Sequence, residues 1–266
     1  MAKIGALVRA AWLAALSYRL GFILSVSTLL FTVVPFYFVA NALQPTMAGV
    51  IQGEGHQYFG FLIVGMMVVT VVTATLYALP NAISAGVANG TLEALFTTPT
   101  PVWVLLAGLS GYEVLFAIVR ATALLLAAAA FGAHVAWDRM GPALPILILL
   151  ILAHIPIGLI GGAMILAFRT AGPLSQIVLT LSVFLGGTYY PTHVIPGWLE
   201  GVSGLLPMTY GLRALRGVLL EGLPFAGVAR DVAVLAAFAV VLTVASVLAF
   251  RAALKYAKRT GSLAQY

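Results

Sequence analysis

Long apolar segments alternate with short polar ones along the whole 266-residue chain. Apolar runs cover roughly residues 20–42, 58–80, 104–133, 143–168, 172–190 and 230–251. A helix needs about 20 apolar residues to cross the hydrocarbon core of a bilayer, and each run approaches or exceeds that length. The pattern predicts an all-α membrane protein in which six transmembrane helices form one domain over residues 1–266.

The N-terminal segment before the first apolar run has a different pattern. Its apolar residues recur at helical spacing between basic ones: Ile4, Leu7, Val8, Trp12 and Leu16. We interpret residues 1–19 as a helix that lies along the cytoplasmic interface of the membrane. An early extension of the first span is the alternative. The apolar run that follows is longer than the core of a signal peptide.

Composition agrees with a chain that is solvated largely by lipid. Hydrophobic residues make up 62% of the chain, charged residues 8%, and the mean hydropathy is +1.11. A soluble domain is usually about half apolar and a quarter charged. The net charge of +6 comes from residues at the ends of apolar runs, which favours membrane topology over nucleic-acid binding.

The placement of lysine and arginine predicts the orientation. If the N-terminus is inside, eight basic residues are inside and four are outside, so both termini are predicted to be cytoplasmic. The inside set is Lys3, Arg9, Arg19, Arg169, Arg251, Lys255, Lys258 and Arg259, and the outside set is Arg139, Arg213, Arg216 and Arg230.

Motifs for catalysis and metal binding are absent from the sequence. There is no G-x-x-x-x-G-K-[ST] phosphate loop, so the chain cannot hydrolyse ATP by that route. There is no H-E-x-x-H or G-x-S-x-G motif and no cysteine. The four histidines are far apart and none pairs with an acid at ligand spacing, so no metal site is predicted.

The polar segment 81–101 contains a predicted short amphipathic helix. Its residues are Gly90, Thr91, Leu92, Glu93, Leu95 and Phe96, followed by Pro99. Gly90 and Thr91 are suited to begin a helix, and Glu93 is favourable near its positive N-terminal end. The apolar residues share one face of this helix. Such a helix is suited to dock into a groove of another protein. An interfacial helix without a partner is equally open.

Residues 191–229 form the longest stretch without a full span, and they are rich in proline, glycine and aromatic residues. Residues 196–206 and 208–220 each resemble a short helix of mixed polarity. Two such helices can enter the outer leaflet and return, provided that protein or water covers their backbone. A folded external loop packed on the bundle is the alternative.

Arg120 lies near the middle of the third span. An arginine at that depth costs at least about 2.5–3.5 kcal/mol, so it should face the bundle interior or water. Glu113 is seven residues earlier on nearly the same face, roughly 10 Å away along the axis, so each residue needs another partner. Two roles remain open for Arg120: a residue of a transport pathway, or a buried contact between helices. In the fourth span, Gly158-x-x-x-Gly162 permits close helix packing.

Two motifs give the chain a family resemblance. The run G-T-L-E-x-L-x-x-T-P at 90–99 resembles the loop of ATP-binding-cassette type-2 permeases. The run Y-Y-P-x-x-x-I-P-G-W-L-x-x-x-x-x-L-L-P-M-T-Y-x-L-x-x-L-R at 189–216 resembles the outer signature of that family. The resemblance extends over essentially the whole chain. One departure is Gly108-Leu109 where members often have Gly-Lys, which weakens the assignment of a basic anchor there.

The resemblance implies a non-catalytic permease subunit of an exporter in the bacterial plasma (inner) membrane. Residues 90–99 would be a coupling helix that contacts a separate ATPase subunit, which binds ATP and Mg, while this chain binds no cofactor. Two permease chains, as a homodimer, would pair with two ATPase chains among the membrane lipids. An amphipathic, lipid-like, drug or glycan substrate would move outward, and the loop is more similar to the drug and nodulation-factor branch.

The resemblance also implies an outer gate formed by the re-entrant helices of residues 191–229. Its candidate residues are Tyr189, Tyr190, Pro191, Pro196, Trp198, Pro207, Tyr210, Arg213 and Arg216. Other classes of protein remain open. A proton-coupled secondary transporter would need an intramembrane acid such as Glu113, and a membrane-embedded lipid-modifying enzyme would need a polar cluster such as His134 with Asp138. A non-transporting assembly or sensor protein would have the same spans.

Overall fold

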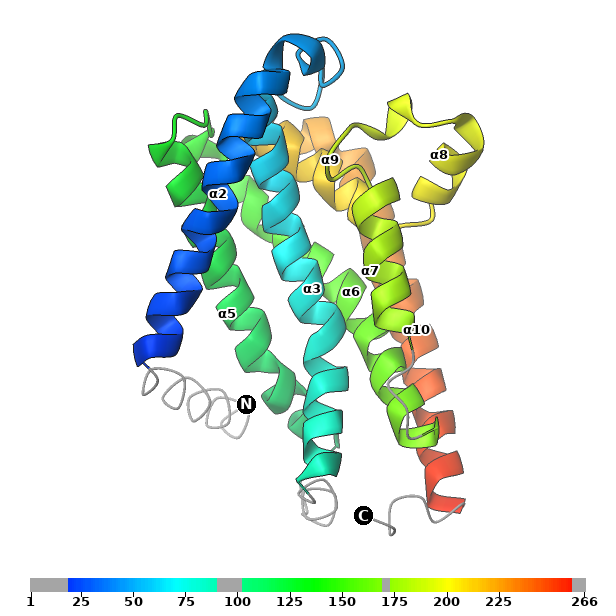
Figure 1. Cartoon of the computed structure of the whole chain (residues 1–266). Coiled ribbons are helices and arrows are strands. Elements are labelled where there is room, and N and C mark those ends of the chain that lie inside the picture. Colours follow the sequence, from blue (N-terminus) through cyan, green and yellow to red (C-terminus); the bar gives the residue numbers. More distant parts are fainter. Residues whose placement is uncertain (1–18, 90–101, 169–172, 260–266) are drawn as a thin grey trace.

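A computed structural model describes the chain over residues 19–89, 102–168 and 173–259. Within these ranges every regular element is helical, which confirms the all-α prediction for the described part. The long helices lie side by side and form one bundle (Figure 1). The elements are α2 (Arg19–Met47), α3 (Tyr58–Ala88), α5 (Val102–Ala130), η1 (Trp137–Arg139), α6 (Met140–Phe168), α7 (Leu174–Leu185), η2 (Thr192–Val194), α8 (Gly197–Ser203), α9 (Pro207–Leu219), η3 (Phe225–Val228) and α10 (Ala229–Arg259).

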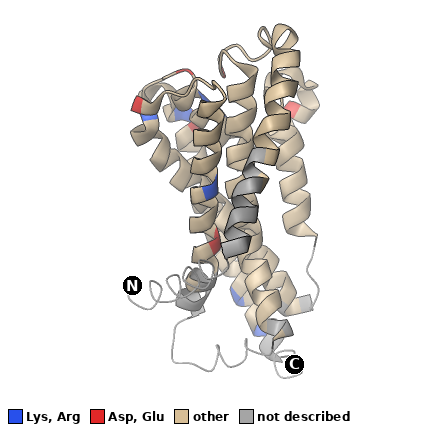
Figure 2. Ribbon diagram, turned by 60° about the vertical axis from the view of Figure 1, so that its left-hand side comes forward, with Lys and Arg blue, Asp and Glu red and all other residues tan. Residues whose placement is uncertain are grey.

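Four helices of the described part are long and apolar enough to cross a membrane. They are α3, α5, α6 and α10, and they correspond to the second, third, fourth and sixth predicted spans. Helix α2, at the place of the first predicted span, has 29 residues. Charged residues lie mostly toward the two ends of the bundle and few lie between them (Figure 2), as expected for helices that contact hydrocarbon.

The helix at the fifth predicted span is much shorter than expected. The sequence predicted a span over residues 172–190, whereas α7 has 12 residues, or roughly 18 Å at 1.5 Å per residue. The helix stops because the chain turns at Gly186 and Gly187, and Gly187 has a φ of 94° that favours glycine. Helix α7 alone is therefore too short to cross a hydrocarbon core of about 30 Å.

Helix α3 is the centre of the bundle and contacts α2, α5, α6, α7 and α9. In its most apolar window 72% of residues are buried, against 11% in α10, whose exposed valines face outward. The helix continues through Pro80 to Ala88, beyond the predicted end at residue 80. Proline cannot donate to the carbonyl four residues earlier. The Ser175 hydroxyl of α7 donates to that carbonyl, on Leu76, at 3.1 Å.

Glycines of α6 allow this helix to pack closely against α3. A Cβ atom at Gly158 would lie 2.6 Å from the Thr75 carbonyl oxygen, and one at Gly162 would lie 2.7 Å from the Ile83 side chain. Both distances are shorter than real Cβ contacts, so only glycine fits without moving the helices. The close packing predicted from the Gly-x-x-x-Gly spacing is confirmed.

Two short helices, α8 and α9, lie at one end of the bundle together with the turn between α2 and α3 (Figure 1). We call this the α8–α9 end. Two short helices were predicted here, and they are present. Helix α9 is buried over most of its length against α6, α10 and α3, so it is part of the packed bundle. Residues 1–18, which include nearly all of the predicted interfacial helix, lie outside the described residues.

Candidate functional site

The predicted coupling residues lie outside the part of the chain that the structure describes. They are Gly90, Thr91, Leu92, Glu93, Leu95 and Phe96. The helices on either side are described: α3 ends at Ala88 and α5 begins at Val102. Both of these helix ends lie opposite the α8–α9 end (Figure 1). Residues 89–101 therefore connect two neighbouring helices at the end of the bundle farthest from α8 and α9.

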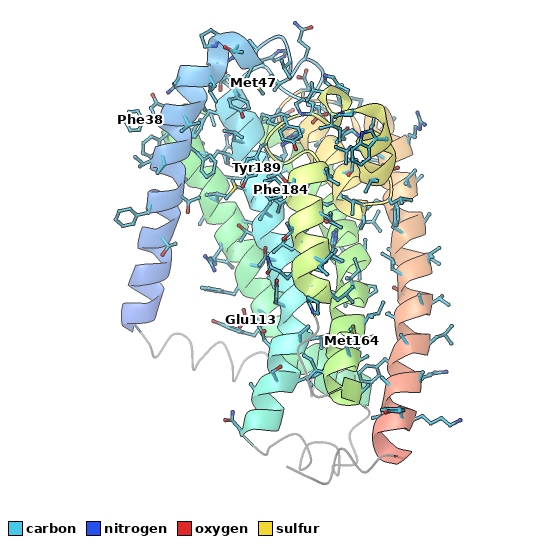
Figure 3. The ribbon with its side chains drawn as sticks, turned by 45° about the vertical axis from the view of Figure 1, so that its right-hand side comes forward. Phe38, Met47, Glu113, Met164, Phe184 and Tyr189 are labelled. Carbon is cyan, nitrogen blue, oxygen red and sulfur yellow. The ribbon has the colours of Figure 1, made fainter. Side chains whose placement is uncertain are left out.

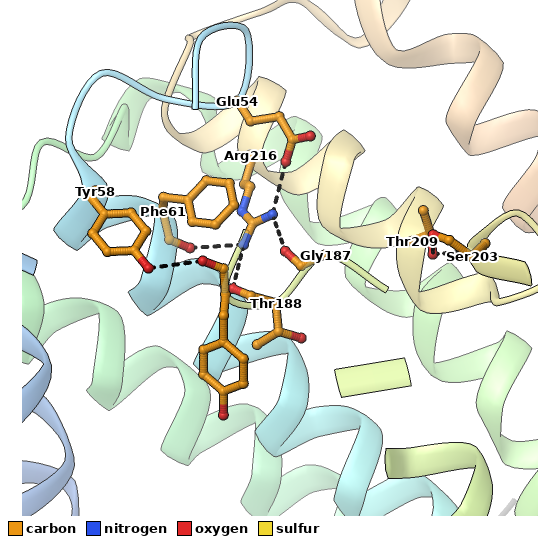
Figure 4. Close-up of polar contacts among 9 residues, drawn as sticks. Glu54, Tyr58, Phe61, Gly187, Thr188, Ser203, Thr209 and Arg216 are labelled. Atoms are coloured by element: carbon orange, nitrogen blue, oxygen red, sulfur yellow. Dashed lines mark hydrogen bonds and ion pairs between the residues drawn. The ribbon is translucent and has the colours of Figure 1, made fainter. Parts of the chain in front are cut away.

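Arg216 is the centre of a polar cluster at the α8–α9 end (Figure 4). Its Nη1 donates to the Glu54 carboxylate at 2.9 Å and to the Gly187 carbonyl at 2.8 Å. Its Nη2 donates to the carbonyls of Thr188 at 3.0 Å and Phe61 at 3.1 Å. One side chain of α9 thus holds the turn before α3, the first turns of α3 and the chain after α7.

The Arg216 side chain is completely buried, while that of Glu54 is 13% exposed. The guanidinium lies 3.3 Å from the centre of the Phe61 ring, a cation–π contact. Burial lowers the pKa of Arg216 to about 10, and the Glu54 carboxylate opposes this effect. Arg216 is therefore charged at neutral pH, and its many acceptors offset the cost of burying that charge.

The chain after α7 is held against α3 by further contacts. The Tyr58 hydroxyl of α3 donates to the Tyr189 carbonyl at 3.0 Å. A Cβ atom at Gly65 would lie 2.6 Å from the Thr188 carbonyl oxygen, so a glycine in α3 is required for this approach. The carbonyls of Gly187, Thr188 and Tyr189 each receive a donor from a side chain, as buried backbone requires.

The other residues of the predicted outer gate make contacts outside the Arg216 cluster. Arg213 lies 5.1 Å from the Tyr210 ring and pairs with Asp231 of α10 at 3.1 Å. The Tyr210 hydroxyl donates to the Gly204 carbonyl, and that of Tyr190 donates to the Phe184 carbonyl. Pro191 and Pro207 are buried, whereas Pro196, directly before α8, and Trp198 of α8 are exposed.

Glu113 and Arg120 line one cleft between α3 and α5, with a volume of about 360 Å³. Neither residue forms an ion pair within the described part of the chain. Their seven-residue separation keeps them apart, as expected. Glu113 lies well away from Tyr189 along the bundle (Figure 3), so the cleft and the Arg216 cluster are separate sites. The described residues contain no group of three or more histidine and acidic residues that could hold a metal ion.

Sequence reasoning missed several residues of both sites. Glu54 lies between the first two predicted spans, and nothing in the local sequence indicates that it contacts Arg216 of α9. The polar residues of the cleft had a detectable signal. Thr70, Thr73, Tyr77 and Asn81 recur at helical spacing within an apolar run, which indicates one polar face on α3.

Comparisons with known proteins agree on one family. Residues 3–220 match the family model described as ABC-2 type transporter. Nodulation protein J of Rhizobium meliloti (strain 1021) is 26% identical over 189 residues, which cover 71% of this chain and 71% of that protein. Inner membrane transport permease YadH of Escherichia coli (strain K12) is 27% identical over 166 residues, which cover 61% of this chain and 63% of that protein. The family match includes both sequence motifs and Arg216.

Proposed function

Because this chain belongs to the ABC-2 type transporter family, as a transmembrane permease that is not itself catalytic, we propose that it exports an amphipathic substrate with energy from a separate ATPase. The substrate class is lipid-like, drug or glycan. The observation that carries the proposal is the family match over residues 3–220 in a chain without a phosphate loop. ATP and Mg would bind to the partner subunit.

We propose that the membrane is a bacterial inner membrane, the location in the name of the Escherichia coli relative. Six crossings would comprise the four long apolar helices, α2, and α7 completed by the chain after it. The first residue of α2 and the last of α10 lie toward the same end of the bundle (Figure 1). This supports two termini on one side, and the positive-inside count makes that side cytoplasmic.

The proposed partners are two ATPase chains and a second copy of this permease. Residues 90–99 would form the coupling helix that contacts the ATPase, with Glu93 as its anchor and Leu92 and Phe96 in the partner's groove. When ATP draws the ATPase subunits together, the coupling helix would move with them. ATP can bias the permease because it binds the closed ATPase pair more tightly than the open one.

Helix α3 is the element suited to transmit this movement across the membrane. It runs from Tyr58 to Ala88, roughly 46 Å at 1.5 Å per residue. Its last residues adjoin the coupling segment, and its first residues contact Arg216 and Tyr189. A packed helix moves as a unit because its interior has no room to deform. A shift at the coupling segment would therefore reach the α8–α9 end.

The Arg216 cluster is the proposed closed state of the outer gate. Its contacts join α9, α3 and the chain after α7, and they must change if these parts separate. The proposed re-entrant pair comprises α8 and α9, and the burial of α9 supports its place inside the bundle. Trp198 and Pro196 on the exposed side of α8 would face lipid or the second permease.

Coupling is tested by Glu93→Arg in the complete transporter, reconstituted in vesicles with its ATPase. The variant is expected to insert normally but to separate ATP hydrolysis from transport, because the reversed charge disrupts the contact with the ATPase. Glu200→Arg is the matched control. It makes the same charge change on the exposed surface of α8 and should leave coupling intact.

Normal pumping by Glu93→Arg would overturn the coupling role of residues 90–99. Transport that follows a proton gradient in vesicles without any ATPase would instead favour a secondary transporter that uses Glu113. Loss of coupling in Glu200→Arg as well would show that the effect is not specific to the coupling segment.

A further inference from the structure

The cleft between α3 and α5 brings together polar residues of two different apolar helices. Its lining comes from two adjacent membrane-spanning helices, and its volume is about 360 Å³. The polar lining residues are Thr70, Thr73, Tyr77 and Asn81 of α3 with Glu113 and Arg120 of α5. The apolar ones are Ala74, Ala78, Phe116 and Ala117.

The charges in this cleft are not neutralised by the described residues. The Nε of Arg120 is shielded from solvent and has no hydrogen-bond partner in the described part of the chain. The guanidinium lies 6.0 Å from the centre of the Phe116 ring, a weak contact. A buried donor without an acceptor costs about 1–3 kcal/mol. The Nε of Arg216 also has no partner in the described residues, but the two terminal nitrogens of Arg216 donate to four acceptors, whereas Arg120 has no ion pair there.

We propose that this cleft binds the headgroup of a membrane amphiphile, with an anionic group at Arg120 and a hydroxyl or ammonium donor at Glu113. Arginine is suited to the anion because its guanidinium presents a planar fork of donors. The carboxylate of Glu113 only accepts hydrogen bonds when ionised, so the group next to it must donate. The two positions are roughly 10 Å apart along the helix axis, so the ligand must present its anionic group and its hydrogen-bond donor at two separate points.

An amphiphile fits this cleft better than a free ion because of where the cleft lies. Arg120 is midway along the apolar window Ser110–Ala130 of α5. A free anion would have to leave water to reach it, whereas a lipid already has its acyl chains in the membrane. The alanines of α3 and α5 leave room for the headgroup between the helices. As a step in transport, this binding rests on the proposed permease function, while binding itself does not.

The test measures equilibrium binding to the purified full-length chain in detergent micelles without ATPase. The probes are fluorescent phosphatidylethanolamine, the diacylglycerol that lacks its phosphate and ammonium, and inorganic phosphate as competitor. We expect phosphatidylethanolamine to bind at least tenfold more tightly than diacylglycerol, and inorganic phosphate not to displace it. Arg120→Gln should lower the preference several-fold, because only the contact of the ammonium with Glu113 remains, whereas Arg120→Lys should lower it less.

Arg139→Gln is the matched control, because Arg139 is a half-exposed arginine that pairs with Asp138 outside the cleft. It should retain the full preference for phosphatidylethanolamine. The preference is a ratio, so a general loss of folded protein does not change it. Equal binding of both lipids by the unmodified chain, displacement by inorganic phosphate, or a full preference in Arg120→Gln would each overturn the proposal. None of these results bears on coupling through Glu93, which the vesicle assay tests separately.

Discussion

Replacing Arg216 by lysine separates the two things that this side chain supplies, its charge and its geometry. The guanidinium uses two nitrogens to donate to four acceptors: the Glu54 carboxylate and the carbonyls of Gly187, Thr188 and Phe61. A lysine ammonium keeps the positive charge but has three donors on a single atom. At least one acceptor therefore loses its donor, and the flat contact with the Phe61 ring is lost.

The magnitude follows from these two losses. An unsatisfied buried acceptor costs about 1–3 kcal/mol, and a desolvated cation–π contact is worth about 0.5–2 kcal/mol. We expect Arg216→Lys to lower the free energy of unfolding by about 1.5–5 kcal/mol, the sum of these two ranges. Arg213→Lys is the matched control on the same helix. Arg213 is 39% exposed, pairs with Asp231 and lies 5.1 Å from the centre of the Tyr210 ring. A lysine can keep this ion pair, so Arg213→Lys should lose about 1 kcal/mol or less.

The free energy of unfolding is measured by titrating the purified chain from a mild detergent into SDS and following helical circular dichroism. Arg216→Lys should lower the free energy of unfolding clearly more than Arg213→Lys does. If the two variants lose the same free energy, the four acceptors do not hold Arg216 as the geometry indicates, and the cluster does not stabilise the closed arrangement of the α8–α9 end.

Two further pairs of variants use the same unfolding measurement. Gly158→Ala should lose about 1–3 kcal/mol because the new Cβ lies 2.6 Å from the Thr75 carbonyl and pushes α6 from α3, whereas Gly141→Ala in open space should lose nothing. Ser175→Ala should lose about 1–3 kcal/mol because it removes the donor to the Leu76 carbonyl. Ser182→Ala should be neutral because that buried hydroxyl has no partner in the described residues. Equal losses within either pair would contradict the assigned contact.

The long apolar helices could be predicted from the sequence because hydropathy over a long window is a local property. Four of the six predicted spans are present as long apolar helices. The close packing of α6 against α3 could also be predicted from the Gly-x-x-x-Gly spacing. The end of α3 was misplaced because Pro80 is normally a helix terminator. Ser175 of α7 compensates for the missing donor, and a local pattern contains no information about such a distant residue.

The length of α7 was overestimated for a related reason. Residues 186–190 continue the apolar and aromatic pattern, but the chain leaves the helix there. The carbonyls of residues 187–189 accept hydrogen bonds from the side chains of Arg216 and Tyr58. The cleft was only half predicted, since Arg120 and Glu113 stood out by charge while the threonines and tyrosine of α3 did not. The contact between Glu54 and Arg216 joins residues far apart in the chain, and no local pattern in a sequence reveals such a pair.

The most direct test of the central claim is the rate of Mg-ATP hydrolysis. It is measured for the purified permease alone and for the permease in complex with the ATPase subunit that co-purifies with it. The account predicts no hydrolysis by this chain alone. With the ATPase present, hydrolysis should drive substrate movement in vesicles, and it should fail to do so when Glu93 is replaced by arginine. Hydrolysis by the single chain, or substrate movement in vesicles that contain no ATPase, would contradict the claim that this permease depends on a partner for its energy.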